Sequence, residues 1–234
     1  MTVYVAMDDT DNLESRGTGR LARAVAAALA ETYTVYGVTR HQLFFNEAIP
    51  YTSHNSCAVV HLPGAGKADI PEIFETTKEI MLGDFVEGSD PGLAVAAAEQ
   101  ISPALVAFGK DAKCTVLTQE KARTLSRNLG IRLEGLGGTE DGVIGSMAGI
   151  GLASTGNDGR FLQIGRVREI TGPAEADALL GAGIDTICTL DGRPVDGGTI
   201  WCKEGKSVKP CPIGGRAVLY VEEKDGQLWG VKRD

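Results

Sequence analysis

Apolar positions in the first two thirds of the chain follow the periods of strands and helices in turn. Residues 2–7 form an apolar run that stops at consecutive acidic residues, which predicts a short strand. Residues 20–32 repeat apolar positions every three to four residues, which predicts an amphipathic helix. The same reasoning predicts strands at 33–38 and 57–62, and helices at 69–82, 92–100, 103–108 and 118–129.

After residue 160 the pattern changes to short strand-like runs separated by turn residues. The runs cover 161–167, 184–190, 199–203, 216–223 and 227–233, and the single helix predicted among them covers 174–180. This change places a domain boundary near residues 155–158, with domains at 1–157 and 158–234 whose strands can share a sheet. The predicted fold class is α/β in the first part and α+β in the second.

Composition and charge narrow the classes of function. The chain has 234 residues, 43% hydrophobic and 23% charged, so it can bury a core and is not a disordered tail. Its net charge of −8 has the wrong sign for holding nucleic acid by broad phosphate neutralisation. Residues 199–234 carry seven basic and five acidic residues, and there Trp201 and Trp229 with nearby lysines form either a nucleic-acid face or an ordinary solvated strand surface.

Cysteine usage and the absence of targeting signals predict a cytoplasmic protein. The five cysteines contain no C-x-x-C pair, which favours reduced thiols over disulfides or a zinc site. No apolar run approaches the roughly 18 residues of a membrane span, and the first apolar stretch is too short for a signal peptide.

Asp8, Asp9 and Asp11 follow the first predicted strand and are the strongest local signal for chemistry. Clustered carboxylates repel one another unless a cation lies among them, and hard oxygen ligands in an open loop suit Mg²⁺. The carboxyl end of a strand is also where α/β sheets bind ligands. The alternative is a solvated turn in which an aspartate caps the following helix.

Two glycine-rich segments offer backbone N–H groups to an anion. Gly17, Thr18 and Gly19 precede the first predicted helix, and residues 135–142 precede a helix of small and apolar residues. The second segment lacks the G-K-[ST] of a P-loop, so phosphate binding there would use the backbone alone. An ordinary helix start explains the first segment equally well, and close helix packing explains the second.

The three histidines provide few options for nucleophilic catalysis. His61 lies in an apolar strand, where a hydrogen-bonded core residue is expected. His54 lies beside Asn55 in a polar loop between two predicted strands and is the better candidate for a site.

Five short stretches occur in the order and spacing of one known family. They cover residues 5–12, 46–55, 89–93, 142–151, and the chain end at 218–220 and 230–233. Together they resemble the archaeal agmatidine synthetases, which modify a cytidine in the anticodon of an isoleucine tRNA. The resemblance implies an N-terminal kinase-like ATP domain followed by a ferredoxin-like domain. It assigns Mg²⁺ and the ATP phosphates to Asp8, Asp9 and Asp11, and ATP would activate a cytosine carbonyl oxygen that agmatine displaces.

The sequence also departs from the family pattern. The family has a pair of threonines, one of which accepts phosphate, where this chain has Arg20 and Leu21. Two cationic positions of the family's polar loop are occupied here by Tyr51 and by Ser53 with His54. The OB-like and zinc-ribbon domains of the family have no counterpart in the sequence. We therefore expect a shortened relative that acts on something other than tRNA.

These observations lead to one main hypothesis and two alternatives. The main one is a ligase-like or kinase-like enzyme that uses ATP and Mg²⁺ to activate or phosphorylate a small-molecule polar substrate. The alternatives are a non-catalytic nucleotide or metabolite binding module, and an RNA-modification subunit whose tRNA requires a separate RNA-binding partner. The expected site comprises Asp8, Asp9, Asp11 and Thr18 for catalysis and metal, Gly17, Arg20, Gly138, Gly142 and Gly145 for the cofactor, and Asn46, Thr52, His54 and Asn55 for the substrate.

Overall fold

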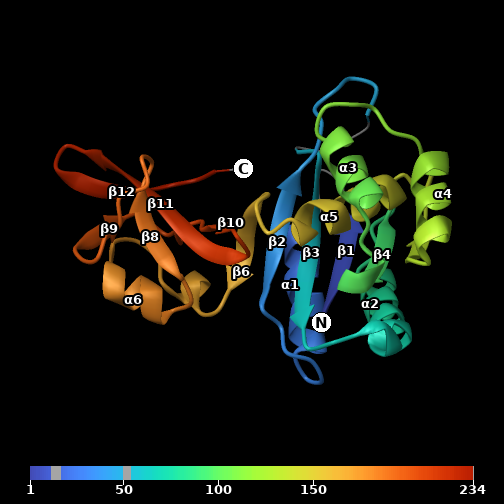
Figure 1. The fold of residues 1–234 in the computed structure, drawn as a ribbon, viewed down its shortest axis with the longest axis horizontal. Coiled ribbons are helices and arrows are strands. Elements are labelled where there is room, and N and C mark those ends of the chain that lie inside the picture. The colour runs from blue at the N-terminus through green and yellow to red at the C-terminus, as the bar shows by residue number, and fades with distance from the viewer. Residues whose placement is uncertain (12–16, 50–53, 234) are drawn as a thin grey trace. The chain divides into compact units, whose positions relative to one another are not determined.

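The computed structural model describes residues 1–11, 17–49 and 54–233, and Figure 1 shows its fold. Thr52, one of the predicted substrate residues, lies outside the described residues. The chain divides into two compact units, Met1–Thr155 and Gly156–Asp234. Among the described residues, no helix has the length and apolar character needed to cross a membrane.

The first unit is built on an antiparallel sheet with strand order β5-β4-β1-β3-β2. Side chains on successive strand residues point to opposite faces, so each face can be covered by helices. The helices α3 and α5 lie over one face (Figure 1), while α1 and α2 pack against strands of the sheet on the other. The strands are β1 (Thr2–Asp8), β2 (Gly37–Gln42), β3 (Ser56–Pro63), β4 (Gly92–Ala97) and β5 (Arg132–Gly135). The helices are α1 (Thr18–Leu29), α2 (Ile70–Gly83), α3 (Pro103–Asp111), α4 (Gln119–Leu129) and α5 (Gly142–Ser154).

Helix α5 lies unusually close to its neighbours because it carries glycine where they meet. A Cβ atom at Gly149 would lie 2.8 Å from Sγ of Cys57 on β3. A Cβ atom at Gly151 would lie 2.3 Å from the carbonyl oxygen of Leu105 on α3. The close packing that the small residues of this segment suggested is therefore present, and it involves both the sheet and a second helix.

Most predicted elements of the first unit are confirmed, with two corrections and one strand that was not expected. Residues 92–100 were expected to be helical, but they form β4 and a single 3₁₀ turn. All six residues of β4 are buried between β1 and β5, and a short apolar run of this kind fits a buried strand as well as a helix. The strand expected at 33–38 begins only at Gly37, and β5 was not expected.

The second unit contains short strands and one helix of six residues, α6 (Ala176–Gly181), within its described part. The strands are β6 (Arg160–Ile164), β7 (Ala174–Glu175), β8 (Thr186–Thr189), β9 (Thr199–Trp201), β10 (Cys211–Ile213), β11 (Arg216–Lys224) and β12 (Gln227–Val231). Five of them follow the order β10-β11-β12-β9-β7, and β8 runs parallel to β11. The ring centroids of Trp201 and Trp229 lie 6.0 Å apart on the neighbouring strands β9 and β12. The ferredoxin-like description stays a prediction.

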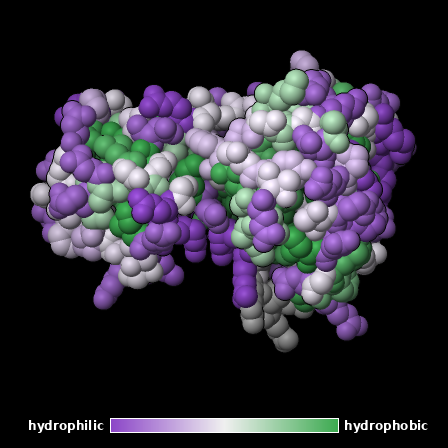
Figure 2. All heavy atoms as spheres, turned by 90° about the horizontal axis from the view of Figure 1, so that it is seen from below, coloured by the Kyte–Doolittle hydropathy of each residue, from purple (hydrophilic) through white to green (hydrophobic). Residues whose placement is uncertain are grey.

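Exposed apolar side chains are spread over both units. Figure 2 shows a visible face that is largely hydrophilic or neutral, with apolar side chains in small patches. Among the described residues of the first unit, the exposed large apolar residues are Met1, Phe45, Leu82, Phe85 and Val116. In the second unit they are Leu190 and Ile213.

Candidate functional site

The strand register brings four chain segments to one end of the first sheet. Asp8 at the end of β1 pairs with Gly92 at the start of β4, and Gly92 in turn pairs with Gly135 at the end of β5. Gln42 at the end of β2 pairs with Ser56 at the start of β3. The segments next to these strand ends therefore meet at the same edge. We call this region the acidic edge and define it by Asp8, Asp9, Asp11, Asp90 and Asp141.

Asp9 is held by its backbone in an uncommon conformation. Its φ angle is 52°, in the left-handed region that most side chains avoid. Its carbonyl oxygen accepts a hydrogen bond of 3.2 Å from the N–H of Asp90, and the carbonyl oxygen of Asp90 accepts one of 2.9 Å from Gly142. These bonds connect the end of β1, the segment before β4 and the start of α5, so the neighbouring structure fixes the conformation of Asp9.

The carboxylate of Asp8 lies against the first turn of α5. A Cβ atom at Gly145 would lie 1.7 Å from Oδ2 of Asp8, and one at Gly142 would lie 2.5 Å from the backbone nitrogen of Gly92. Both glycines were expected to contact a cofactor. In the structure the space beside them is filled by Asp8 and by the strand backbone, and their lack of a side chain allows this approach.

Burial and like charge raise the pKa values of two of these carboxyl groups. The pKa of Asp8 lies well above its ordinary value, first because the group is desolvated and then because Asp9 and Asp11 are nearby. The pKa of Asp9 is raised to about 6 by desolvation, followed by the charges of Asp90, Asp11 and Asp141. Within the described residues, no ion pair reaches any of these carboxylates.

The acidic edge is not a ready-made metal cage. In the part of the chain that the structure describes, no three His, Cys, Asp or Glu side chains converge on one position for an ion. Mg²⁺ does not need such a cage, because it retains several waters and is often held by one or two carboxylates together with substrate phosphates. Asp8 and Asp9 are adjacent in the chain and supply carboxylates of this kind.

The first turn of α1 is organised around Asp11 and Thr18. Oδ2 of Asp11 accepts a hydrogen bond of 3.4 Å from the N–H of Thr18, so this carboxylate lies where the helix N-terminus favours negative charge. The Thr18 hydroxyl is buried and accepts a hydrogen bond of 3.0 Å from Thr10. Gly17 has a φ of 82°, and Arg20 is exposed in the first turn of the helix. The helix-capping alternative for the acidic loop therefore applies to Asp11.

The loop after β5 wraps around Asp90, which was not among the expected site residues. Gly138 has a φ of 58°, and a Cβ atom there would lie 2.0 Å from Oδ1 of Asp90. The N–H of Thr139 donates a hydrogen bond to the same oxygen. Only the resemblance pointed to residues 89–93, and it gave Asp90 no role.

The predicted substrate residues that the structure describes mainly organise their own loop. Nδ2 of Asn55 donates a hydrogen bond of 2.8 Å to the carbonyl oxygen of Phe44. Oδ1 of Asn46 accepts one of 3.0 Å from the N–H of Ala48. His54 is exposed. The register places this loop at the same end of the sheet as Asp8, but the hydrogen bonds of Asn46 and Asn55 hold the loop itself.

His61 belongs to a buried polar cluster on the same sheet. The Thr39 hydroxyl lies 2.8 Å from Nε2 of His41 and 2.8 Å from Nε2 of His61. Burial, and then the proximity of His41, lower the pKa of His61 to about 3. The prediction of a hydrogen-bonded core histidine is confirmed.

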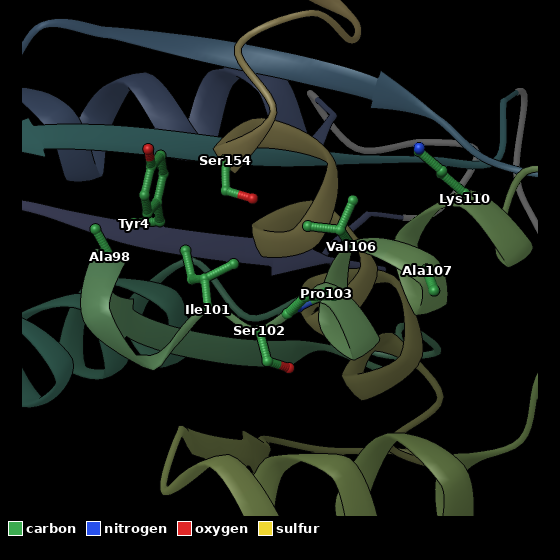
Figure 3. A pocket seen from close by; sticks show the side chains of 9 residues that line it. All are labelled: Tyr4, Ala98, Ile101, Ser102, Pro103, Val106, Ala107, Lys110 and Ser154. Atoms are coloured by element: carbon green, nitrogen blue, oxygen red, sulfur yellow. The ribbon is translucent and has the colours of Figure 1, made fainter.

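A pocket of about 640 Å³ lies at the other end of α5 (Figure 3). Its walls come from the start of β1, the segment after β4, the outer side of α3 and the end of α5. Tyr4, Lys110 and Ser154 provide polar groups at its rim, whereas Ile101 and Val106 provide apolar surface. The Ser102 hydroxyl is the one buried side-chain polar atom without a hydrogen-bond partner among the described residues, and Figure 3 shows it directed away from Tyr4 and Ser154. None of the predicted site residues lines this pocket.

Several solved structures of enzymes that act on tRNA are similar in fold to this chain. A tRNA fluorescent labeling enzyme is 24% identical with a TM-score of 0.56, and the match covers 64% of this chain and 36% of that chain. The apo form of TiaS, the agmatidine synthetase of an isoleucine tRNA, is 22% identical with a TM-score of 0.55, covering 64% and 35%. A complex of TiaS with this tRNA and ATP is 23% identical with a TM-score of 0.56, covering 64% and 36%.

These similarities show a shared fold. They confirm the mixed α/β fold class, in which the sheet of the first unit is antiparallel. The match spans little more than a third of the length of these structures. No family model and no curated protein sequence matches the chain.

Proposed function

We propose that the chain is a magnesium-dependent enzyme that binds ATP at the acidic edge and activates or phosphorylates a small polar substrate. The observation that carries this proposal is Asp9, a half-buried carboxylate in a left-handed conformation beside Asp90 and Asp11. Such an arrangement is unfavourable unless a cation joins it. The likeness of fold to a TiaS complex that contains ATP supports the choice of nucleotide.

Asp8 and Asp9 are the residues that would hold Mg²⁺, with Asp90 beside them. The ion would neutralise charge on the triphosphate. The exposed Arg20 in the first turn of α1 offers a second positive charge to a phosphate oxygen. The glycines of α5 contribute indirectly, because they allow the Asp8 carboxylate to lie against the helix.

The buried position of the Thr18 hydroxyl supports a second candidate function, a nucleotide-binding module without group transfer. Its hydroxyl is buried and hydrogen-bonded to Thr10, so it would have to leave this position to accept a phosphate. A tRNA substrate is not part of either proposal for the chain alone, because a net charge of −8 opposes broad phosphate contact. Such a substrate would need a separate RNA-binding partner.

Calorimetric titration of ATP with and without Mg²⁺ tests the nucleotide site. We expect binding that requires Mg²⁺ and that Asp9→Asn abolishes. Glu99→Gln is the matched control, since it removes an exposed carboxylate just beyond the opposite end of β4 and should bind normally. Equal binding by Asp9→Asn and the wild type would contradict the proposal.

Turnover separates the two candidate functions. An enzyme should release ADP or AMP in the presence of an acceptor, whereas a binding module should hold ATP intact with every acceptor supplied. Thr18→Val, which keeps the size of the side chain, should leave nucleotide binding in place. If it also leaves turnover unchanged, Thr18 does not accept phosphate.

A further inference from the structure

Phe85 lies in the segment of chain that connects α2 to β4, and 44% of its surface is exposed. An exposed phenylalanine is ordinary by itself. The ring of Phe85 is unusual because it packs closely against the backbone of a glycine. A Cβ atom at Gly137 would lie 2.6 Å from Cε2 and 3.0 Å from Cζ of the ring. The ring therefore rests directly on the backbone of Gly137, which limits its motion and leaves part of it open to solvent.

The glycine loop that supports Phe85 also contacts the acidic edge. Gly138 follows Gly137 and lies against Oδ1 of Asp90, and the next N–H, that of Thr139, donates to the same oxygen. Two residues of extended chain span about 7 Å. The supported ring and the Asp90 carboxylate are therefore separated by less than the length of a nucleoside triphosphate.

The segment between Phe85 and Asp90 is closed into a turn. The carbonyl oxygen of Val86 accepts hydrogen bonds from both the N–H and the hydroxyl of Ser89, at 3.1 and 2.6 Å. Ser89 is only 1% exposed. The ring and the carboxylate are thus joined by a short, internally bonded turn as well as by the glycine loop.

We propose that Phe85 is the surface on which the nucleobase stacks when the acidic edge holds the phosphates of a nucleoside triphosphate. This inference rests on the proposed function. Every base presents a flat π face, and an aromatic ring that is held in place can stack with it at little cost in entropy. Because a phenyl ring has no hydrogen-bonding group, Phe85 positions the base without distinguishing adenine from guanine.

The test compares Mg²⁺-ATP with Mg²⁺-tripolyphosphate, which has the phosphates but no base. We expect Phe85→Ala and Phe85→Leu to bind ATP at least about 10-fold more weakly and tripolyphosphate as the wild type does. Phe85→Tyr should bind both normally. Leu82→Ala is the matched control, because Leu82 is 46% exposed on α2 and carries no role in the proposal.

Phe85→Leu separates stacking from simple support of the loop, since leucine can still cover Gly137. If Phe85→Leu binds ATP normally, the residue only packs and the inference is wrong. A parallel loss of tripolyphosphate binding would also overturn it, because the loop rather than the base contact would then be affected. A wild type that binds tripolyphosphate and ATP equally well would refute the stacking role but leave the metal and phosphate site standing. Binding of neither compound would refute the proposed function as well.

Fluorescence gives a direct readout of stacking. In Phe85→Trp, ATP should change the indole emission after subtraction of the wild-type signal from Trp201 and Trp229, and tripolyphosphate should not. An unchanged difference spectrum at saturating ATP would contradict the proposal.

Discussion

Two groups of ionisable residues on the same sheet differ in the partners around them. One is the acidic edge, and the other is the buried cluster of Thr39, His41 and His61, which we call the Thr39 cluster. In the Thr39 cluster a single hydroxyl lies 2.8 Å from a ring nitrogen of both His41 and His61. At the acidic edge, burial and neighbouring carboxylates raise the pKa of Asp9 to about 6, and no ion pair within the described residues offsets them. A hydrogen-bonded polar cluster strengthens the fold, whereas buried carboxylates of like charge weaken it and are typical of functional sites.

The largest expected effect on stability comes from adding a side chain at a glycine where α5 packs against the acidic edge. In Gly142→Ala the new Cβ atom would lie 2.5 Å from the backbone nitrogen of Gly92 and 2.7 Å from the carbonyl oxygen of Asp8. Backbone atoms cannot move aside as a flexible side chain can, so we expect a loss of about 3 kcal/mol in unfolding free energy, measured in urea. Gly83→Ala, with open space at the end of α2, should be near neutral. Similar midpoints for the two variants would show that α5 is not tightly docked.

Thr39→Val tests the Thr39 cluster. The substitution keeps the branched shape but removes the hydroxyl that two ring nitrogens share, so we expect a loss of about 2 kcal/mol in unfolding free energy. Thr39→Ser keeps the hydroxyl and should lose less. If the serine variant is the less stable of the two, packing rather than hydrogen bonding dominates at this position.

The pH dependence of the unfolding free energy should show the contribution of His61. Its pKa in the folded protein is about 3, against an ordinary value of 6.5, so between these values the unfolded chain binds the proton and the folded protein does not. The contribution of His61 is therefore complete above pH 6.5 and declines as the pH falls towards 3, by roughly 1 to 2 kcal/mol between pH 6.5 and 5. Denaturation curves across this range, compared with His61→Gln, isolate the effect. Parallel curves for the two proteins would contradict it.

Asp9→Asn should give the smallest change, with the opposite sign. Removing a half-buried negative charge from beside Asp90 relieves repulsion, so we expect the variant to be about 1 kcal/mol more stable than the wild type at neutral pH in metal-free buffer. Thermal unfolding with a chelator present measures this. A destabilised variant would mean that the charged form of Asp9 supports the fold.

The elements of the first unit were predictable wherever their apolar period was long enough to identify. Helices α1 and α4 have clear amphipathic repeats, whereas β4 is a run of six buried residues that has no distinguishing period. Asp8, Asp9 and Asp11 were predictable because they adjoin one another in sequence. Asp90 was missed because it joins them only through the pairing of β1 with β4 and through the loop after β5. Similarly, nothing local indicated that Asn46 and Asn55 bond within their own loop.

The glycines of α5 also bear on the order in which the protein folds. Gly142, Gly145, Gly149 and Gly151 occupy four of the 13 positions of this helix, and each costs about 1 kcal/mol of helix propensity relative to alanine. An isolated peptide of this sequence should therefore be largely random coil, and the segment should become helical only when β1, β3 and α3 are in place to receive it. The acidic edge, which the first turn of α5 closes, would then be completed in the last steps of folding, so a nascent or partly unfolded chain would not yet have the proposed nucleotide site.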